Sequence, residues 1–154
     1  MLKINDKIPN FEILTDQGEF KISNYTGKNI VIFFFPKADT SGCTKESIAF
    51  TNLQKEFDQL NCIVIGISKD DPKKQGKFRQ KHNLTCELGA DFENNVCEQF
   101  GVWVEKSMYG RKYMGIQRAT FLSNEKGIIT NVWEKVKVPG HAEDVLEAVK
   151  RINK

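Results

Sequence analysis

The pattern of apolar and polar residues predicts strands that alternate with helices. Two continuous apolar runs, residues 30–35 and 62–68, are typical of strands buried on both faces. Between them, apolar residues recur every three to five positions, which predicts one helix over residues 43–60. Its apolar face carries Ile48, Phe50, Leu53, Phe57 and Leu60. A strand, a helix and a strand in this order imply a crossover between two parallel strands.

Shorter patterns predict the other elements. Strands are expected at residues 12–14, 19–21, 119–123 and 128–134, and helices at residues 72–82, 93–100 and 142–152. Asp70 or Asp71 is the expected N-cap of the helix at 72–82, and Gly101 ends the helix at 93–100. The turn at residues 124–127 joins the last two strands as an antiparallel hairpin.

Together these elements predict an α/β fold in which a mixed β-sheet is flanked by helices on both faces. The chain shows no repeats, no low-complexity tract and no linker. Residues 1–154 are therefore expected to form a single domain. Residues 103–113 are expected to be a loop that contributes to the wall of a pocket.

The composition is that of a globular protein without a dedicated charged surface. With 40% hydrophobic residues, 154 residues suffice to bury a core without a metal or a disulfide to hold it. The 23 basic and 20 acidic residues are scattered, so neither nucleic acid nor a membrane surface is an expected partner. Residues 1–7 lack the apolar core of a secretory signal, and no apolar run is long enough to cross a bilayer. The cytoplasm is the expected location.

The four cysteines, Cys43, Cys62, Cys86 and Cys97, are expected to be thiols at rest. They are too few for a disulfide scaffold, and none forms a C-x-x-C pair. Cys43 follows a buried strand and begins a helix. The N-terminus of a helix stabilises a thiolate over a thiol and lowers the pKa of a cysteine from its ordinary ~8.5. Cys43 is therefore the candidate nucleophile.

The residues around Cys43 carry a family resemblance. Pro36, Thr40 and Cys43 fit the pattern P-x-x-x-T-x-x-C, which resembles that of the peroxiredoxins, thiol peroxidases with a thioredoxin-like fold. Residues 7–11, 115–122 and 136–141 resemble one branch, the bacterioferritin comigratory protein group or Q type. The resemblance runs over nearly the whole chain.

The resemblance implies a role for each site residue. Cys43 attacks the peroxide, and Arg118 holds the thiolate and polarises the peroxide. Thr40 presents its hydroxyl to the peroxide, Gly42 permits close approach of the backbone, and Pro36 shields the thiolate from solvent. No metal or organic cofactor is needed.

Plain structural roles are the alternatives for these residues. Cys43 could be a small core residue, Arg118 part of a surface ion pair, and Thr40 an N-cap. Lys45 and Glu46 are interpreted as charges on the helix surface. His141 is interpreted as the start of the last helix, and metal binding by His82, Cys86 and Cys97 is disfavoured because the ligand spacing is wrong.

The chain departs from the family pattern at the second thiol. Many relatives carry a resolving cysteine where this chain has Ile48, and others where it has Arg79. Cys62 is interpreted as a core residue. Cys86, expected in a polar loop, and Cys97, expected on a short helix, are the possible resolving cysteines, and each would require local unfolding around Cys43. Otherwise a single cysteine acts and an external thiol completes the cycle.

A smaller departure is Ser41, which stands where relatives often carry proline, so the loop before Cys43 is expected to be looser. The predicted function is a peroxidase that reduces hydrogen peroxide and organic hydroperoxides, recycled by thioredoxin or a small thiol, and the resemblance favours a monomer. The alternative is a redox sensor, a relay or a chaperone-like module that uses the same thiolate without efficient turnover. A disulfide exchanger is disfavoured because the C-x-x-C motif is missing.

Overall fold

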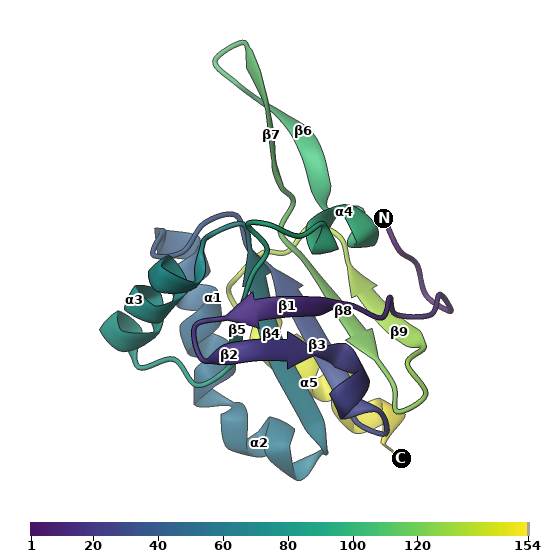
Figure 1. Ribbon diagram of the computed structural model, residues 1–154. Coiled ribbons are helices and arrows are strands. Elements are labelled where there is room, and N and C mark those ends of the chain that lie inside the picture. Colours follow the sequence, from purple (N-terminus) through teal and green to yellow (C-terminus); the bar gives the residue numbers. More distant parts are fainter. Residues whose placement is uncertain (154) are drawn as a thin grey trace.

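The computed structural model describes residues 1–153 and is built around one seven-stranded sheet (Figure 1). The strands lie in the order β2-β1-β5-β4-β3-β8-β9. Their bounds are β1 Glu12–Thr15, β2 Gly18–Lys21, β3 Asn29–Phe34, β4 Cys62–Ser68, β5 Glu87–Ala90, β8 Ala119–Ser123 and β9 Ile129–Trp133. A second sheet consists of β6 Trp103–Met108 and β7 Arg111–Ile116. The helices are α1 Ser41–Asn52, α2 Gln54–Gln59, α3 Pro72–His82, α4 Val96–Phe100 and α5 His141–Ile152, with a 3-10 turn, η1, at Ile22–Tyr25.

The predicted parallel crossover is confirmed. β3 and β4 pair in parallel over six positions, from Asn29 opposite Cys62 to Phe34 opposite Ile67. β5 continues the parallel part beside β4, whereas β8 and β9 add antiparallel strands on the other side of β3. The carboxyl end of β3 therefore lies in the middle of the sheet, where the chain leaves it to begin α1.

Helices cover both faces of the sheet, as predicted, but unequally. Successive residues of a strand point to opposite faces, and Val31 and Phe33 belong to one hydrophobic cluster while Ile30 and Ile32 belong to the other. The first cluster includes buried residues of α1, α2, α3 and α5, and we call this side the helical face. The opposite face is covered by η1, α4 and the end of the β6–β7 hairpin that adjoins the sheet.

The helix predicted over residues 43–60 is two helices, α1 and α2. Leu53 separates them, because its N–H bonds to the carbonyl of Phe50, three residues back, instead of four. Phe50 and Phe57 still face the same core, so the apolar periodicity continues across the break and conceals it. All helices within residues 1–153 are too short or too polar to cross a membrane.

The predicted caps of α3 and α4 are largely confirmed. Asp71, rather than Asp70, caps α3, because its carboxylate accepts the N–H of Lys74 at 2.8 Å. α4 ends at Gly101, as expected, but starts only at Val96.

Three strands were not predicted. β5 is short and contains Gly89, which weakens the strand pattern. β6 and β7 form a hairpin where a loop was expected over residues 103–113, and the hairpin projects from the body of the molecule (Figure 1). Its turn is Tyr109-Gly110, and both residues have positive φ, as a two-residue hairpin turn requires. Because most of the hairpin packs on no core, its sequence carries no apolar alternation.

Gly66 of β4 leaves room for a core aromatic ring, which gives a first testable prediction. A Cβ at Gly66 would lie 2.5 Å from Cζ of Phe33, which is itself stacked on Phe50 of α1. We expect Gly66→Ala to lower the free energy of unfolding by about 1–3 kcal/mol through overpacking. Urea unfolding measures the change. Gly76→Ala, in α3, is the control, because its Cβ would make an ordinary contact at 3.6 Å with Cβ of Asp16. Equal effects of the two substitutions would contradict the packing argument.

Candidate active site

Cys43 lies in the first turn of α1, just after the loop that follows β3. It is fully buried, with 0% of its surface exposed, and it belongs to the hydrophobic cluster of the helical face. The first N–H groups of a helix have no partner within the helix and favour negative charge at this end. The buried sulfur therefore lies where a developing negative charge is stabilised by backbone.

Arg118 is brought to Cys43 by strand pairing. It directly precedes β8, which pairs with β3 so that Ala119 lies opposite Phe34. This register places Arg118 beside the end of β3, where the loop to α1 begins. Its Nη2 donates a hydrogen bond to Cys43 Sγ at 3.2 Å. The two residues are 75 positions apart in the chain and adjacent in the fold.

Gly42 leaves space for the guanidinium at the start of α1. A Cβ at this position would lie 3.1 Å from Nη2 of Arg118, closer than nine in ten Cβ contacts in proteins. A larger residue would push the guanidinium away from the sulfur. The structure therefore brings Gly42, Cys43 and Arg118 together.

Glu46 is buried, which corrects its interpretation as a surface charge. It lies one helical turn after Cys43, is 1% exposed, and accepts a hydrogen bond from Arg118 Nη1 at 2.6 Å. Burial raises its carboxyl pKa to about 7, although the charge of Arg118 opposes this shift. Burial also disfavours the charge on Arg118, but the charges of Glu46 and Cys43 raise the guanidinium pKa. Lys45, by contrast, is exposed as expected.

Thr40 and Pro36 belong to the loop before α1, and both are exposed. Thr40 is the N-cap residue by position, yet its side chain makes no capping bond. Its hydroxyl donates instead to the carbonyl of Lys37 at 2.8 Å. A rotation about χ1 would free this hydroxyl for another acceptor.

The same loop is anchored to the segment around α3 by two aspartates, Asp39 and Asp70, and the sequence predicted this role for neither of them. Asp70 accepts the N–H of Ala38 at 2.7 Å. Asp39, with φ +63, binds both Lys81 and His82 at 2.9 Å, and these two partners lower its pKa, with Lys81 the larger cause. The anchors link residues more than 30 positions apart, and no sequence motif marks them.

Lys106 is a further site residue that the sequence did not reveal. It lies on β6, opposite Tyr113 of β7. Burial lowers its pKa, the charge of Arg118 lowers it further, and the charge of Cys43 raises it. The hairpin thus brings a second cation within electrostatic range of Cys43.

The other three cysteines are buried, and only two of them share the face of Cys43. Cys62 and Cys86 belong to the cluster of the helical face, whereas Cys97 lies in the cluster on the opposite face. Burial raises the pKa of Cys62 and of Cys86 to about 12, and it also raises that of Cys97. Cys86 was expected in a polar loop, but it is 2% exposed, because apolar neighbours enclose it. Cys97 is separated from Cys43 by the whole thickness of the sheet.

His141 begins α5, as interpreted, and is buried beside the site. Its Nε2 lies 2.8 Å from Oγ1 of Thr120, and its ring packs edge-on against Phe50 and Trp133. Burial lowers its pKa to about 4, so the ring is neutral at pH 7. The neutral ring therefore supports α1 through its contact with Phe50.

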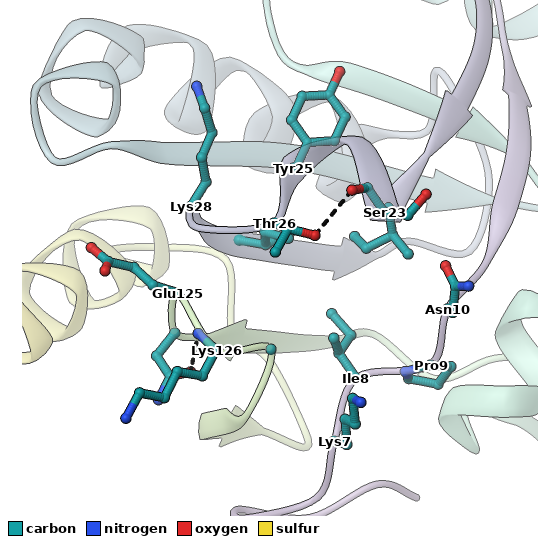
Figure 2. Close-up of a pocket in the computed structure, with 14 residues that line it drawn as sticks. Lys7, Ile8, Pro9, Asn10, Ser23, Tyr25, Thr26, Lys28, Glu125 and Lys126 are labelled. Carbon is teal, nitrogen blue, oxygen red and sulfur yellow. Dashed lines mark hydrogen bonds between the residues drawn. The ribbon is translucent and has the colours of Figure 1, made fainter.

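A separate cleft of about 320 Å³ lies away from Cys43, between the N-terminal segment, η1 and the turn after β8 (Figure 2). Lys7, Lys28 and Lys126 lie around it, but their side chains point in different directions. Its lining contains no cysteine and no histidine. It offers no thiol, so the candidate site is the one at Cys43.

A buried sulfur that a guanidinium binds at the start of a helix, on a mixed sheet, defines a thiol-based redox protein. The family model described as AhpC/TSA matches residues 4–132, and the chain belongs to this family. The family resemblance seen in Pro36, Thr40 and Cys43 is thereby confirmed.

Relatives match the chain over almost its full length. It is 44% identical over 146 residues to a putative peroxiredoxin bcp of Coxiella burnetii, a match that covers 94% of this chain and 97% of the relative. A Xanthomonas campestris peroxiredoxin Q structure superposes with a TM-score of 0.92 at 35% identity, covering 98% of this chain and 99% of that one. A bacterioferritin comigratory protein of the same organism superposes with a TM-score of 0.92 at 34% identity, covering 99% and 100%. These matches confirm the predicted thioredoxin-like fold and the Q-type branch.

Proposed function

We propose that the protein reduces hydrogen peroxide and organic hydroperoxides through a sulfenic acid on Cys43. The observation that carries this proposal is the 3.2 Å hydrogen bond from Arg118 to the sulfur in the first turn of α1. Thiol-dependent peroxidase activity is the activity of the family. The related Xanthomonas protein was studied for alkyl peroxide reduction, which supports the inclusion of organic hydroperoxides.

The site chemistry follows from the position of Arg118 beside Cys43. The Cys43 thiolate attacks one peroxide oxygen, the O–O bond breaks, and the sulfur becomes a sulfenic acid. The departing oxygen leaves as hydroxide or alkoxide and takes a proton from solvent. Arg118 supplies positive charge next to the sulfur, where this negative charge develops. The Thr40 hydroxyl turns from Lys37 to the peroxide, and no step requires a metal or an organic cofactor.

The reductant is a thiol, and we propose that it comes from outside the chain, either thioredoxin or a small thiol. The two positions where relatives carry a resolving cysteine hold Ile48 and Arg79 here. Cys97 lies on the opposite face of the sheet from Cys43. Cys86 lies on the same face, but a disulfide with it requires unwinding of the first turns of α1, because its neighbour Thr85 binds Thr51 near the other end of that helix. A one-cysteine cycle requires an external thiol to reach the buried Cys43 sulfur, but it does not require Cys86 to reach it.

Peptide mapping after oxidation tests this proposal. We expect one equivalent of hydrogen peroxide, without reductant, to place a sulfenic or sulfinic acid on Cys43 alone. Mass spectrometry of the wild type, Cys43→Ser, Cys86→Ser and Cys97→Ser identifies the oxidised residue. A Cys43–Cys86 disulfide would refute the one-cysteine cycle but keep the peroxidase, whereas a reduced Cys43 in folded protein would refute both. Multiple turnovers with thioredoxin or a small thiol separate a peroxidase from a sensor or relay.

We further propose that the chain works as a single thioredoxin-like domain, as a monomer, in the cytoplasm. The two hydrophobic clusters lie on the two faces of one sheet, which supports a single folding unit. Four cysteines without a disulfide suit a reducing compartment. Sedimentation equilibrium tests the monomer, and a dimer at micromolar concentration would overturn it.

A further inference from the structure

A cleft lined by lysines lies beside the loop that precedes Cys43. It has a volume of about 470 Å³, within the range of small-molecule sites. One wall is the loop and the other is the exposed side of α3. The lining residues are Lys37, Ala38, Asp39, Asp70, Lys74, Lys77, Phe78 and Lys81.

The cleft carries positive charge that the protein does not neutralise. Its lining contains four lysines and two aspartates. Asp39 pairs with Lys81 and His82, whereas Asp70 accepts hydrogen bonds from neutral donors, the Ala38 N–H and the Ser68 hydroxyl. The other lining lysines form no ion pair with a carboxylate of residues 1–153; they are Lys37, Lys74 and Lys77. Three unpaired cations around an apolar floor favour a small ligand with carboxylate or phosphate groups.

The cleft is lined in part by the loop that leads to Cys43. Lys37 and Ala38 are six and five residues before Cys43, and Ala38 packs against the hydrophobic cluster that contains Cys43. Cys43 has no exposed surface, so any reductant reaches its sulfur only after a local movement, and a small thiol needs a smaller opening than a protein thiol. A molecule held in the cleft contacts the loop that leads into the helix of Cys43.

We propose that this cleft binds the anionic part of a small thiol that reduces oxidised Cys43. The inference rests on the proposed one-cysteine cycle. The thiol sulfur attacks the sulfenic sulfur, which forms a mixed disulfide and releases water. A second thiol molecule then attacks the mixed disulfide, which restores the Cys43 thiol and releases the small disulfide. The peroxide is the oxidant, and the two thiol molecules supply the two electrons.

Single-turnover recycling tests the cleft, with glutathione as an anionic probe and its diethyl ester as a probe without carboxylates. We expect Lys74→Gln/Lys77→Gln to slow reduction of the Cys43 sulfenic acid by glutathione about tenfold at low ionic strength, an effect that salt removes. Reduction by the ester and oxidation by hydrogen peroxide stay unchanged. Lys73→Gln/Lys150→Gln is the matched control, because it removes the same charge from lysines outside the cleft and keeps wild-type rates.

Three results would overturn the cleft proposal. The first is equal slowing of glutathione and its ester in the cleft variant. The second is an equal effect of the control variant. The third is slower oxidation by a carboxylate-bearing hydroperoxide with unchanged recycling, which would assign the cleft to the oxidant.

A binding measurement tests the cleft independently of peroxidase activity. S-methylglutathione cannot react, so its titration into reduced Cys43→Ser protein reports the cleft alone. We expect saturable NMR shifts of the backbone amides of residues 37–39 and 72–82, weakened by Lys74→Gln/Lys77→Gln. Their absence would refute the cleft even if Cys43 is oxidised normally, whereas an unreactive Cys43 with normal binding would refute only the peroxidase.

Discussion

Replacing Arg118 with glutamine is expected to lower the second-order rate constant of Cys43 with hydrogen peroxide by about a hundredfold or more, the usual cost of removing one preorganised donor. Arg118 donates a hydrogen bond to the sulfur that attacks the peroxide, so its charge lies close to the reacting atoms. Glutamine keeps a polar side chain but removes the positive charge and the two-pronged reach to Cys43 and Glu46. Stopped-flow fluorescence of the two tryptophans, Trp103 and Trp133, measures the rate of oxidation.

Arg79→Gln is the matched control for this experiment. Arg79 is also a half-buried arginine in a short ion pair, at 2.6 Å from Asp16, but it lies on α3 outside the site. We expect this variant to lose stability while its Cys43 reacts at the wild-type rate. A rate constant for Arg118→Gln within a factor of about three of the wild-type value would remove Arg118 from the proposed mechanism, since that is far below the cost of a lost catalytic donor.

Replacing Glu46 with glutamine is expected to remove a pH dependence from the stability of the protein. Burial raises the folded-state pKa of Glu46 to about 7, above the ordinary 4.5 of the unfolded chain. Between these values the folded state binds a proton that the unfolded state has released. The wild type is therefore most stable below pH 4.5 with respect to this group, and it loses up to about 3 kcal/mol as the pH rises to 7 and above.

Urea unfolding of wild type and Glu46→Gln from pH 4.5 to 8 measures this effect. The glutamine oxygen can still accept the hydrogen bond of Arg118, so the variant is expected to fold. Glu56→Gln, an exposed carboxylate on α2, is the control and should keep the wild-type slope. Parallel curves for wild type and Glu46→Gln would contradict the assignment of the buried proton to Glu46.

The sequence predicted the central strands β3 and β4 because they are buried on both faces of the sheet. Continuous apolar runs such as those of β3 and β4 need no knowledge of the partner strand. The β6–β7 hairpin escaped prediction for the opposite reason, since most of it packs against nothing and its sequence shows no apolar face. The break between α1 and α2 was hidden because both helices bury phenylalanines against one core.

The site residues likewise fall into two groups, those that the sequence identified and those that only the fold brings to the site. Thr40, Gly42 and Cys43 are close in the chain, so their spacing was visible in the sequence, and Arg118 was assigned through family resemblance. Glu46 was interpreted as a surface charge because the sequence of α1 alone does not show that Arg118, just before β8, donates a hydrogen bond to Glu46. Lys106 and Asp70 carry no motif, and only the fold brings them to the site or to its loop.

The sequence by itself determined the α/β order of elements, the helix that begins near Cys43 and the family, because these depend on local periodicity and on a short motif. Only the tertiary structure decided which charges surround the sulfur, which cysteines share its face and where a cleft with unpaired lysines lies against the loop before it. The reason is physical. Charge and burial at a point depend on residues that the sheet brings together from distant parts of the chain, and no local pattern encodes that meeting.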